Sequence, residues 1–279
     1  MKRYISLLVV IFLLSVSNSL SAQKVFKILA IGNSFSQDAV EQNLYQLAKA
    51  EGYQVIIGNM MIGGCTLQRH LNNAVNDTAV YSYRKINING KKVVEENVSL
   101  KTALKDEDWD YVSLQQASAL SGMYNTYEVS LPDLVKYVRQ YLSQDTKLIL
   151  HQTWAYAANS THRAFKNYKH DQMNMYVAIM TAVKKAVDLV KFDILIPSGT
   201  AIQNARTSFV GDNWNRDGFH LAPKGRYVAA CTWFESVFGH NVVGNSYCPK
   251  NMSAEECKVA QIAAHQAVLH PYEVTNIGD

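Results

Sequence analysis

The chain has 279 residues, of which 48% are hydrophobic and 18% are charged, and its formal net charge is +4. This composition excludes a disordered polypeptide, and the length is sufficient for one large domain with a substantial core. Lysine and arginine are scattered along the chain, so the sequence predicts neither a nucleic-acid-binding surface nor a polybasic membrane surface.

The N-terminal residues are typical of a secretory signal peptide. Lys2 and Arg3 form a positively charged start, and an apolar run over residues 5–16 is followed by small residues. The run is shorter than the ~20 residues that span a bilayer, so cleavage is favoured over a membrane anchor. We therefore expect a signal peptide at residues 1–22 and a single exported domain at residues 23–279, with no stable membrane insertion.

The chain contains four cysteines. Cysteines of an exported protein can form disulfides, and Cys248 and Cys257 are the best candidate pair because they are close in sequence. Cys65 follows two glycines and is more typical of a small packed residue than of a nucleophile. No C-x-x-C motif is present, which argues against zinc ribbons and redox motifs.

Predicted strands alternate with predicted helices along the chain. The strands are residues 25–31, 53–61, 110–116, 147–152 and 192–196, and the helices are residues 38–50, 67–75, 131–142, 172–190, 223–238 and 253–269. Buried strands that alternate with amphipathic helices indicate a mostly parallel sheet covered on both faces. We predict a three-layer α/β/α sandwich around a five-stranded sheet, with the functional site beyond the carboxyl ends of the strands.

One segment departs from this alternation. Within residues 79–97, Asn89 and Gly90 separate two runs with β character. An Asn-Gly pair between such runs is a strong hairpin signal. We expect this hairpin to be an insertion that flanks the site.

Ser34 lies where the first predicted strand ends. The free N–H groups of a helix start can stabilise an oxyanion there, although a serine at this place can also simply cap the helix. A nucleophilic serine needs a base and an orienting acid. Asp217 and His220 lie three residues apart in a loop that contains Gly and Pro, and this spacing lets the carboxylate orient the imidazole.

These stretches together resemble the SGNH, or GDSL-type, hydrolase superfamily. The tripeptide GNS at residues 32–34 resembles the first block of the superfamily, whose serine is the nucleophile, although Asn replaces the usual Asp. Gly64, in MIGGCTL, matches the glycine that supplies an oxyanion-hole N–H. The D-x-x-H of Asp217 and His220 matches the last block. The resemblance implies a flavodoxin-like SGNH hydrolase fold in which Ser34, His220 and Asp217 are nucleophile, base and orienting acid.

The third block of the superfamily departs from the pattern. It usually carries Gly-x-Asn, whose Asn side chain donates to the oxyanion, whereas this chain has LQQASALSG. Gln115 or Gln116 could donate instead, as the resemblance to carbohydrate-esterase branches related to sialate O-acetylesterases implies. The alternative is that both amides satisfy backbone groups at the strand end. The N–H groups of Ser34 and Gly64 are the other two expected donors.

Aromatic side chains near these motifs are candidates for substrate binding. Trp154 and Tyr156 follow the fourth predicted strand, while Trp214 and Phe219 flank the Asp–His loop. Aromatic faces pack well against sugar rings, and ordinary packing of the loops is the alternative. His151 lies at a strand end, where it could approach the site.

The resemblance implies an exported serine esterase in a bacterial periplasm or outside the cell, which acts on a small-molecule or glycan ester. Carbohydrates that carry O-acetyl or other short acyl groups are the expected substrates. A lipase or thioesterase of the same superfamily and a non-catalytic carbohydrate-binding protein are the alternatives. No cofactor is expected, since dinucleotide and Walker motifs are absent, and the eight histidines show no tight metal-ligand spacing.

Overall fold

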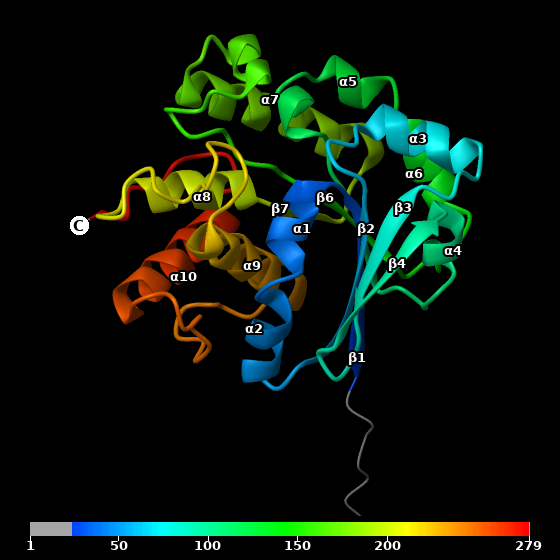
Figure 1. Ribbon diagram of the computed structural model, residues 1–279, viewed down its shortest axis with the longest axis horizontal. Helices are drawn as coiled ribbons and strands as arrows, with labels where there is room; N and C mark the ends of the chain where they lie inside the picture. The colour runs from blue at the N-terminus through cyan, green and yellow to red at the C-terminus, as the bar shows by residue number, and fades with distance from the viewer. Residues whose placement is uncertain (1–23, 279) are drawn as a thin grey trace, which may run out of the picture.

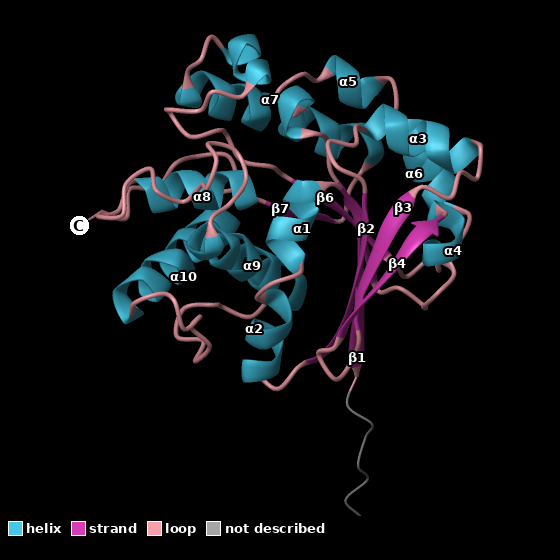
Figure 2. Cartoon of the chain, viewed as in Figure 1, coloured by secondary structure: helices cyan, strands magenta, loops and turns pink. Residues whose placement is uncertain are grey.

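A seven-stranded sheet lies at the centre of the computed structural model, which describes residues 24–278. The strand order is β4-β3-β2-β1-β5-β6-β7. Strands β2, β1, β5, β6 and β7 run parallel, whereas β3 and β4 are antiparallel to their neighbours (Figure 2). The strands are β1 Val25–Gly32, β2 Gln54–Met61, β3 Tyr81–Ile86, β4 Lys92–Val98, β5 Tyr111–Leu114, β6 Lys147–His151 and β7 Ile194–Ile196.

Helices cover both faces of the sheet and form the predicted three layers (Figure 1). One layer contains α1, α2, α9 and α10, with α8 packed on α9 and α10, and the other contains α3 to α7. The helices are α1 Ser34–Val40, α2 Leu44–Ala50, α3 Leu67–Val75, α4 Leu100–Leu104, α5 Asn125–Glu128, α6 Leu131–Arg139, α7 Gln172–Val190, α8 Ser198–Arg206, α9 Pro223–Phe238 and α10 Ala254–Leu269, with 3₁₀ turns η1 Ser118–Leu120 and η2 Arg163–Tyr168.

The predicted hairpin is present, between β2 and β5 in the chain. Strand β3 pairs with β2, so the hairpin extends the sheet from the expected five strands to seven. Tyr81 and Ile86 of β3 belong to the core. Strand β4 is exposed along most of its length and carries Lys92, Glu95 and Glu96, charges that discourage another chain from pairing with this edge.

The predicted first helix, residues 38–50, is two helices in the structure. Helix α1 begins earlier, at Ser34, because the Asn33 side chain accepts a hydrogen bond from the Phe35 N–H at 2.9 Å. The helical path is interrupted at Glu41, whose buried carboxylate accepts from the Asn59 side chain at 2.7 Å. Helix α8 was not predicted because its sequence, SGTAIQNAR, has no apolar periodicity.

Cys248 and Cys257 form the predicted disulfide, while Cys65 and Cys231 are free and buried. Within residues 24–278, no helix has the length and apolar character needed to cross a membrane. The predicted signal peptide at residues 1–22 lies outside the described residues.

Helix α9 packs closely against the loop that precedes it. The Ala222 N–H donates to the Trp214 carbonyl at 2.8 Å. A Cβ atom added at Gly225 would lie 2.3 Å from the same carbonyl oxygen, so only glycine permits this approach. The contact fixes the start of α9 against a loop that also carries Asp217 and His220.

We expect Gly225→Ala to destabilise the protein by about 1–3 kcal/mol, because the added methyl group forces the loop and helix apart. Alanine has the higher helix propensity, which alone would stabilise α9 by about 1 kcal/mol. Urea unfolding followed by circular dichroism measures the sign of the change. A more stable variant would show that the contact with Trp214 is loose.

Candidate active site

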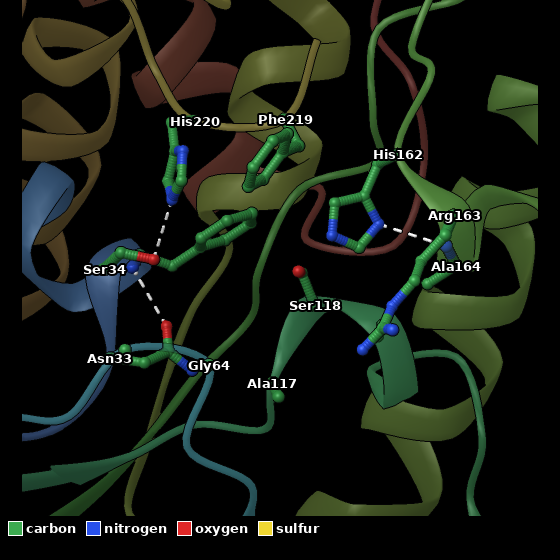
Figure 3. A pocket seen from close by; sticks show the side chains of 13 residues that line it. Asn33, Ser34, Gly64, Ala117, Ser118, His162, Arg163, Ala164, Phe219 and His220 are labelled. Atoms are coloured by element: carbon green, nitrogen blue, oxygen red, sulfur yellow. Dashed lines mark hydrogen bonds between the residues drawn. The ribbon is translucent and has the colours of Figure 1, made fainter. Parts of the chain in front are cut away.

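Loops at the carboxyl ends of the parallel strands surround a pocket of about 450 Å³ (Figure 3). The turn after β1 contributes Ser34, the loop after β2 contributes Gly63 and Gly64, and the segment after β5 contributes Ser118. The start of η2 and the loop before α9, with Phe219 and His220, complete the lining. This is the edge of a parallel sheet where ligands bind.

The structure brings Ser34, His220 and Asp217 together in one hydrogen-bonded chain. Ser34 Oγ lies 2.9 Å from His220 Nε2, and His220 Nδ1 lies 2.7 Å from Asp217 Oδ2 (Figure 3 shows the first of these contacts). The other carboxylate oxygen, Asp217 Oδ1, accepts the backbone N–H of His220 at 2.7 Å and that of Phe219 at 3.2 Å. With Nδ1–H donating to Asp217, Nε2 of a neutral His220 is free to take the serine proton.

Asp217 is held in its ionised form. Partial burial raises the pKa of its carboxyl group, but the hydrogen bonds from the His220 ring and from the backbone N–H groups outweigh this effect. The pKa of Asp217 therefore lies below its ordinary value, and the carboxylate can stabilise a positive charge on His220.

A single buried amide connects the serine turn to the loop of Gly64. Asn33 Oδ1 accepts from the Phe35 N–H, and Asn33 Nδ2 donates to the Cys65 carbonyl at 3.1 Å. Asn33 is 2% exposed, so these bonds are protected from water. The turn after β1 and the loop after β2 are thereby held in a defined relative position.

The N–H groups of Ser34 and Gly64 are available to an oxyanion. Both residues line the pocket, and neither N–H has an acceptor within residues 24–278. Gly64 has φ +61°, a left-handed conformation that glycine adopts without strain. Unpaired N–H groups beside a nucleophile can stabilise a tetrahedral oxyanion.

Neither predicted glutamine donor faces the pocket. Gln115 Nε2 donates to Asn33 Oδ1 at 2.8 Å. Gln116 Nε2 donates to Thr126 Oγ1 at 3.0 Å, while its Oε1 accepts the N–H groups of Leu67 and Ala117. The amide groups of both side chains form hydrogen bonds with neighbouring loops. The predicted donation by Gln115 or Gln116 to the oxyanion is therefore not observed.

Gln115 belongs to a buried hydrogen-bond network in which each donor and acceptor can be assigned in only one way. Because Asn33 Oδ1 accepts from a backbone N–H, Gln115 must approach it with Nε2, and its Oε1 must accept from His151 Nδ1 at 2.8 Å. The second ring nitrogen of His151 then accepts the hydroxyl of Ser198 at 3.0 Å. Complete burial lowers the pKa of His151 to about 3, so the ring is neutral. His151 thus acts on the site through Gln115 and Asn33.

A second buried group, Asp38 in α1, holds the Asp–His loop. Its carboxylate accepts the Leu221 N–H at 2.9 Å, Arg226 Nε at 2.8 Å and Arg216 Nη1 at 3.1 Å. Asp38 is 1% exposed. The sequence did not predict that Asp38 binds the Asp–His loop. The available signal was a carboxylate among the apolar residues of a predicted helix, since such a group is seldom buried without a partner.

Three of the four predicted substrate-binding aromatics are fully buried. Trp154, Tyr156 and Trp214 are 0% exposed and do not line the pocket, so they cannot contact a substrate directly. Trp154 instead stacks on Phe35 with ring centroids 4.2 Å apart, and its indole N–H donates to the Phe219 carbonyl. Phe219 does line the pocket, as predicted.

The pocket also contains polar side chains that the sequence analysis did not single out. Ser118, His162 and Arg163 all line it (Figure 3). They follow no motif, and η2 was not predicted. Residues 24–278 contain no group of three or more His, Cys, Asp or Glu side chains that could bind a metal ion.

The layers and the position of the pocket define the class of fold, which is that of the SGNH hydrolases. A protein from Slackia heliotrinireducens assigned to these hydrolases is 20% identical, with a TM-score of 0.53 over 76% of this chain and 99% of that chain. A mutant of an acetyl-xylooligosaccharide esterase from Geobacillus stearothermophilus is 14% identical, with a TM-score of 0.50 over 76% of this chain and 93% of that chain. At such identities the likeness shows the fold alone.

The family follows from stronger matches. Residues 27–267 match the family model described as a domain of unknown function, DUF4886. The crystal structure of a DUF4886 family protein from Bacteroides uniformis is 55% identical, with a TM-score of 0.90 over 91% of this chain and 98% of that chain. The chain belongs to the DUF4886 family. None of the curated proteins compared with it matches.

We expect Asp38→Asn to lower the free energy of unfolding by about 2–3 kcal/mol, because the amide loses the charge that Arg216 and Arg226 neutralise and cannot accept all three hydrogen bonds. Urea unfolding measures the loss. Asp77→Asn is the matched control, since Asp77 forms an exposed pair with Lys101 and should change stability by less than about 0.5 kcal/mol. Equal effects of the two substitutions would contradict the role of Asp38.

The neutral His151 predicts a pH dependence of stability. On unfolding, His151 regains an ordinary pKa of about 6.5 and binds a proton that the folded form takes up only near pH 3. The free energy of unfolding therefore falls by about 1.4 kcal/mol per pH unit, for this proton, as the pH drops through the range between these values. His70, with a pKa lowered to about 3 by burial, adds a similar slope.

His151→Asn should remove the slope of one proton, which urea unfolding at pH 6, 5 and 4 measures. His270→Asn, at an exposed position, serves as the control and should keep the slope of the wild type. If His151→Asn also kept that slope, the folded protein would carry His151 in its protonated form.

Proposed function

We propose that this chain is an exported serine esterase that removes acetyl or other short acyl groups from carbohydrates. The observation that carries the proposal is the hydrogen-bonded chain Ser34–His220–Asp217, which lies beside the unpaired N–H groups of Ser34 and Gly64 in one pocket. A nucleophile, a base, an orienting carboxylate and oxyanion donors are the parts that acyl transfer requires.

In the proposed reaction, Ser34 Oγ attacks the ester carbonyl carbon while His220 Nε2 accepts the serine proton. The oxyanion that forms is stabilised by the N–H groups of Ser34 and Gly64, each of which contributes about 3 kcal/mol of transition-state stabilisation. His220 then protonates the leaving alcohol, and the acyl group remains on Ser34. Water, deprotonated by His220, releases the carboxylic acid and restores the serine.

Two features support a short acyl group and a polar alcohol. Ser118, His162 and Arg163 line the pocket and can form hydrogen bonds with the hydroxyl groups of a sugar alcohol. The acetyl-xylooligosaccharide esterase that shares the fold has a substrate of this kind.

The proposal of export is supported by two further observations. The predicted signal peptide at residues 1–22 precedes the domain, and a disulfide joins Cys248 and Cys257. Disulfides persist mainly in oxidising compartments such as the bacterial periplasm and the extracellular space. The 55% identity with a Bacteroides uniformis protein supports a bacterial setting.

We expect the protein to hydrolyse p-nitrophenyl acetate faster than p-nitrophenyl palmitate, and Ser34→Ala to lower kcat for the acetate by about 10⁴-fold or more. Spectrophotometric release of p-nitrophenol measures both. Ser118→Ala is the matched control, because it removes another pocket hydroxyl that has no histidine as a base, and it should change kcat by less than tenfold.

The other outcomes separate the alternatives. A preference for palmitate would favour a lipase or thioesterase. Equal rates with wild type and Ser34→Ala, or no turnover by either, would contradict the proposed nucleophile and favour a non-catalytic carbohydrate-binding protein.

A further inference from the structure

His162 and Arg163, at the start of η2, face the same pocket as the nucleophile. In Figure 3, Ser34 and His220 lie at one end of the pocket, and His162 and Arg163 lie at the other. An acetyl group on Ser34 is far smaller than a pocket of about 450 Å³. With an acetyl group on Ser34, the end of the pocket that His162 and Arg163 line is left for the alcohol part of the ester.

Arg163 contributes a positive charge that is not paired with a carboxylate among the described residues. Its side chain is exposed, and it forms no ion pair within residues 24–278. Among the residues that line the pocket, Arg163 alone carries a permanent charge. The nearby carboxylate of Asp217 already binds His220 and two backbone N–H groups. The pocket thus presents an uncompensated guanidinium to its ligand.

His162 contributes a hydrogen-bond donor of defined orientation. The Ala164 N–H donates to His162 Nδ1 at 3.2 Å, so the proton of the neutral ring lies on Nε2. Burial and the charge of Arg163 lower the pKa of His162 more than the carboxylate of Asp217 raises it, so the ring is neutral at neutral pH. The ring packs between Tyr156 and Phe219, with centroids at 4.9 Å and 4.6 Å. Nε2–H has no acceptor among the described residues.

We propose that Arg163 and His162 form a subsite for a carboxylate on the alcohol part of the substrate, so that the preferred substrates are short-acyl esters of acidic carbohydrates. The inference rests on the proposed esterase function. A guanidinium binds a carboxylate through two parallel N–H···O hydrogen bonds, and the neutral imidazole can donate a third. No acidic residue is among those that line the pocket.

The test compares methyl glucuronoside and methyl glucoside, each acetylated at the same secondary hydroxyl, so that the two substrates differ only at C6, where one carries a carboxylate and the other a hydroxymethyl group. Acetate release gives kcat/KM for each, and the readout is the ratio of the anionic to the neutral ester. The wild type should give a ratio above one that falls as salt is added. Arg163→Gln should lower the ratio about tenfold, and Arg163→Glu should bring it below one. His162→Leu should lower the ratio less than Arg163→Gln does.

Lys166→Gln is the matched control, because Lys166 is an exposed cation on the same 3₁₀ turn that does not line the pocket. It should keep the ratio of the wild type. A wild-type ratio of one or less, or a ratio that Arg163→Gln leaves unchanged, would overturn the anionic subsite while the neutral ester is still hydrolysed by Ser34. If the protein hydrolysed none of the three esters, neither the two sugar esters nor p-nitrophenyl acetate, the result would overturn the proposed esterase function and the subsite with it.

Discussion

The arrangement of the site depends on the buried side-chain amide of Asn33. Its oxygen accepts from the first turn of α1 and from Gln115, and its nitrogen donates to the Cys65 carbonyl. An aspartate, which is usual at this place in SGNH hydrolases, offers only acceptor oxygens and could not donate to Cys65. Asn33 replaces the usual Asp in this chain, and its partner, the Cys65 carbonyl, requires the N–H donor that only the amide provides.

The consequence of this bond is that the two N–H groups proposed as oxyanion donors are positioned before a substrate arrives. The N–H of Ser34 belongs to the turn that Asn33 caps, and the N–H of Gly64 precedes the carbonyl that Asn33 holds. Asp38 fixes the position of Asp217 and His220 in a similar way, because its carboxylate binds their loop to α1. Preorganised dipoles cost no reorganisation during the reaction, which is where enzymes gain most of their electrostatic stabilisation.

Much of the fold could be predicted because it follows from local patterns. Apolar runs indicated the five parallel strands, and the observed bounds of α3, α7 and α9 are the predicted ones. The Asn89-Gly90 turn indicated the hairpin, but its pairing with β2 is a tertiary contact that no local pattern encodes. Helix α8 lacks apolar periodicity and is buried by α9 and α10, so its sequence carries no amphipathic signal.

The site was predictable only where a motif encodes it. Short motifs indicated the juxtaposition of Ser34 with Asp217 and His220, and the structure shows it. The directions of side chains were not predictable. Gln115 and Trp154 form buried hydrogen bonds with residues that are far away in sequence. Proximity to a strand end places a residue near the pocket but does not decide whether it faces the substrate.

The measurement that tests the central claim most directly is covalent labelling with a fluorophosphonate, followed by mass spectrometry of the intact protein and its peptides. Such probes react with serines that a neighbouring base activates. The account predicts one adduct per chain, located on Ser34, and a large loss of labelling rate in His220→Ala. An adduct on another residue, or no adduct on a folded protein, would contradict the assignment of Ser34 as an activated nucleophile.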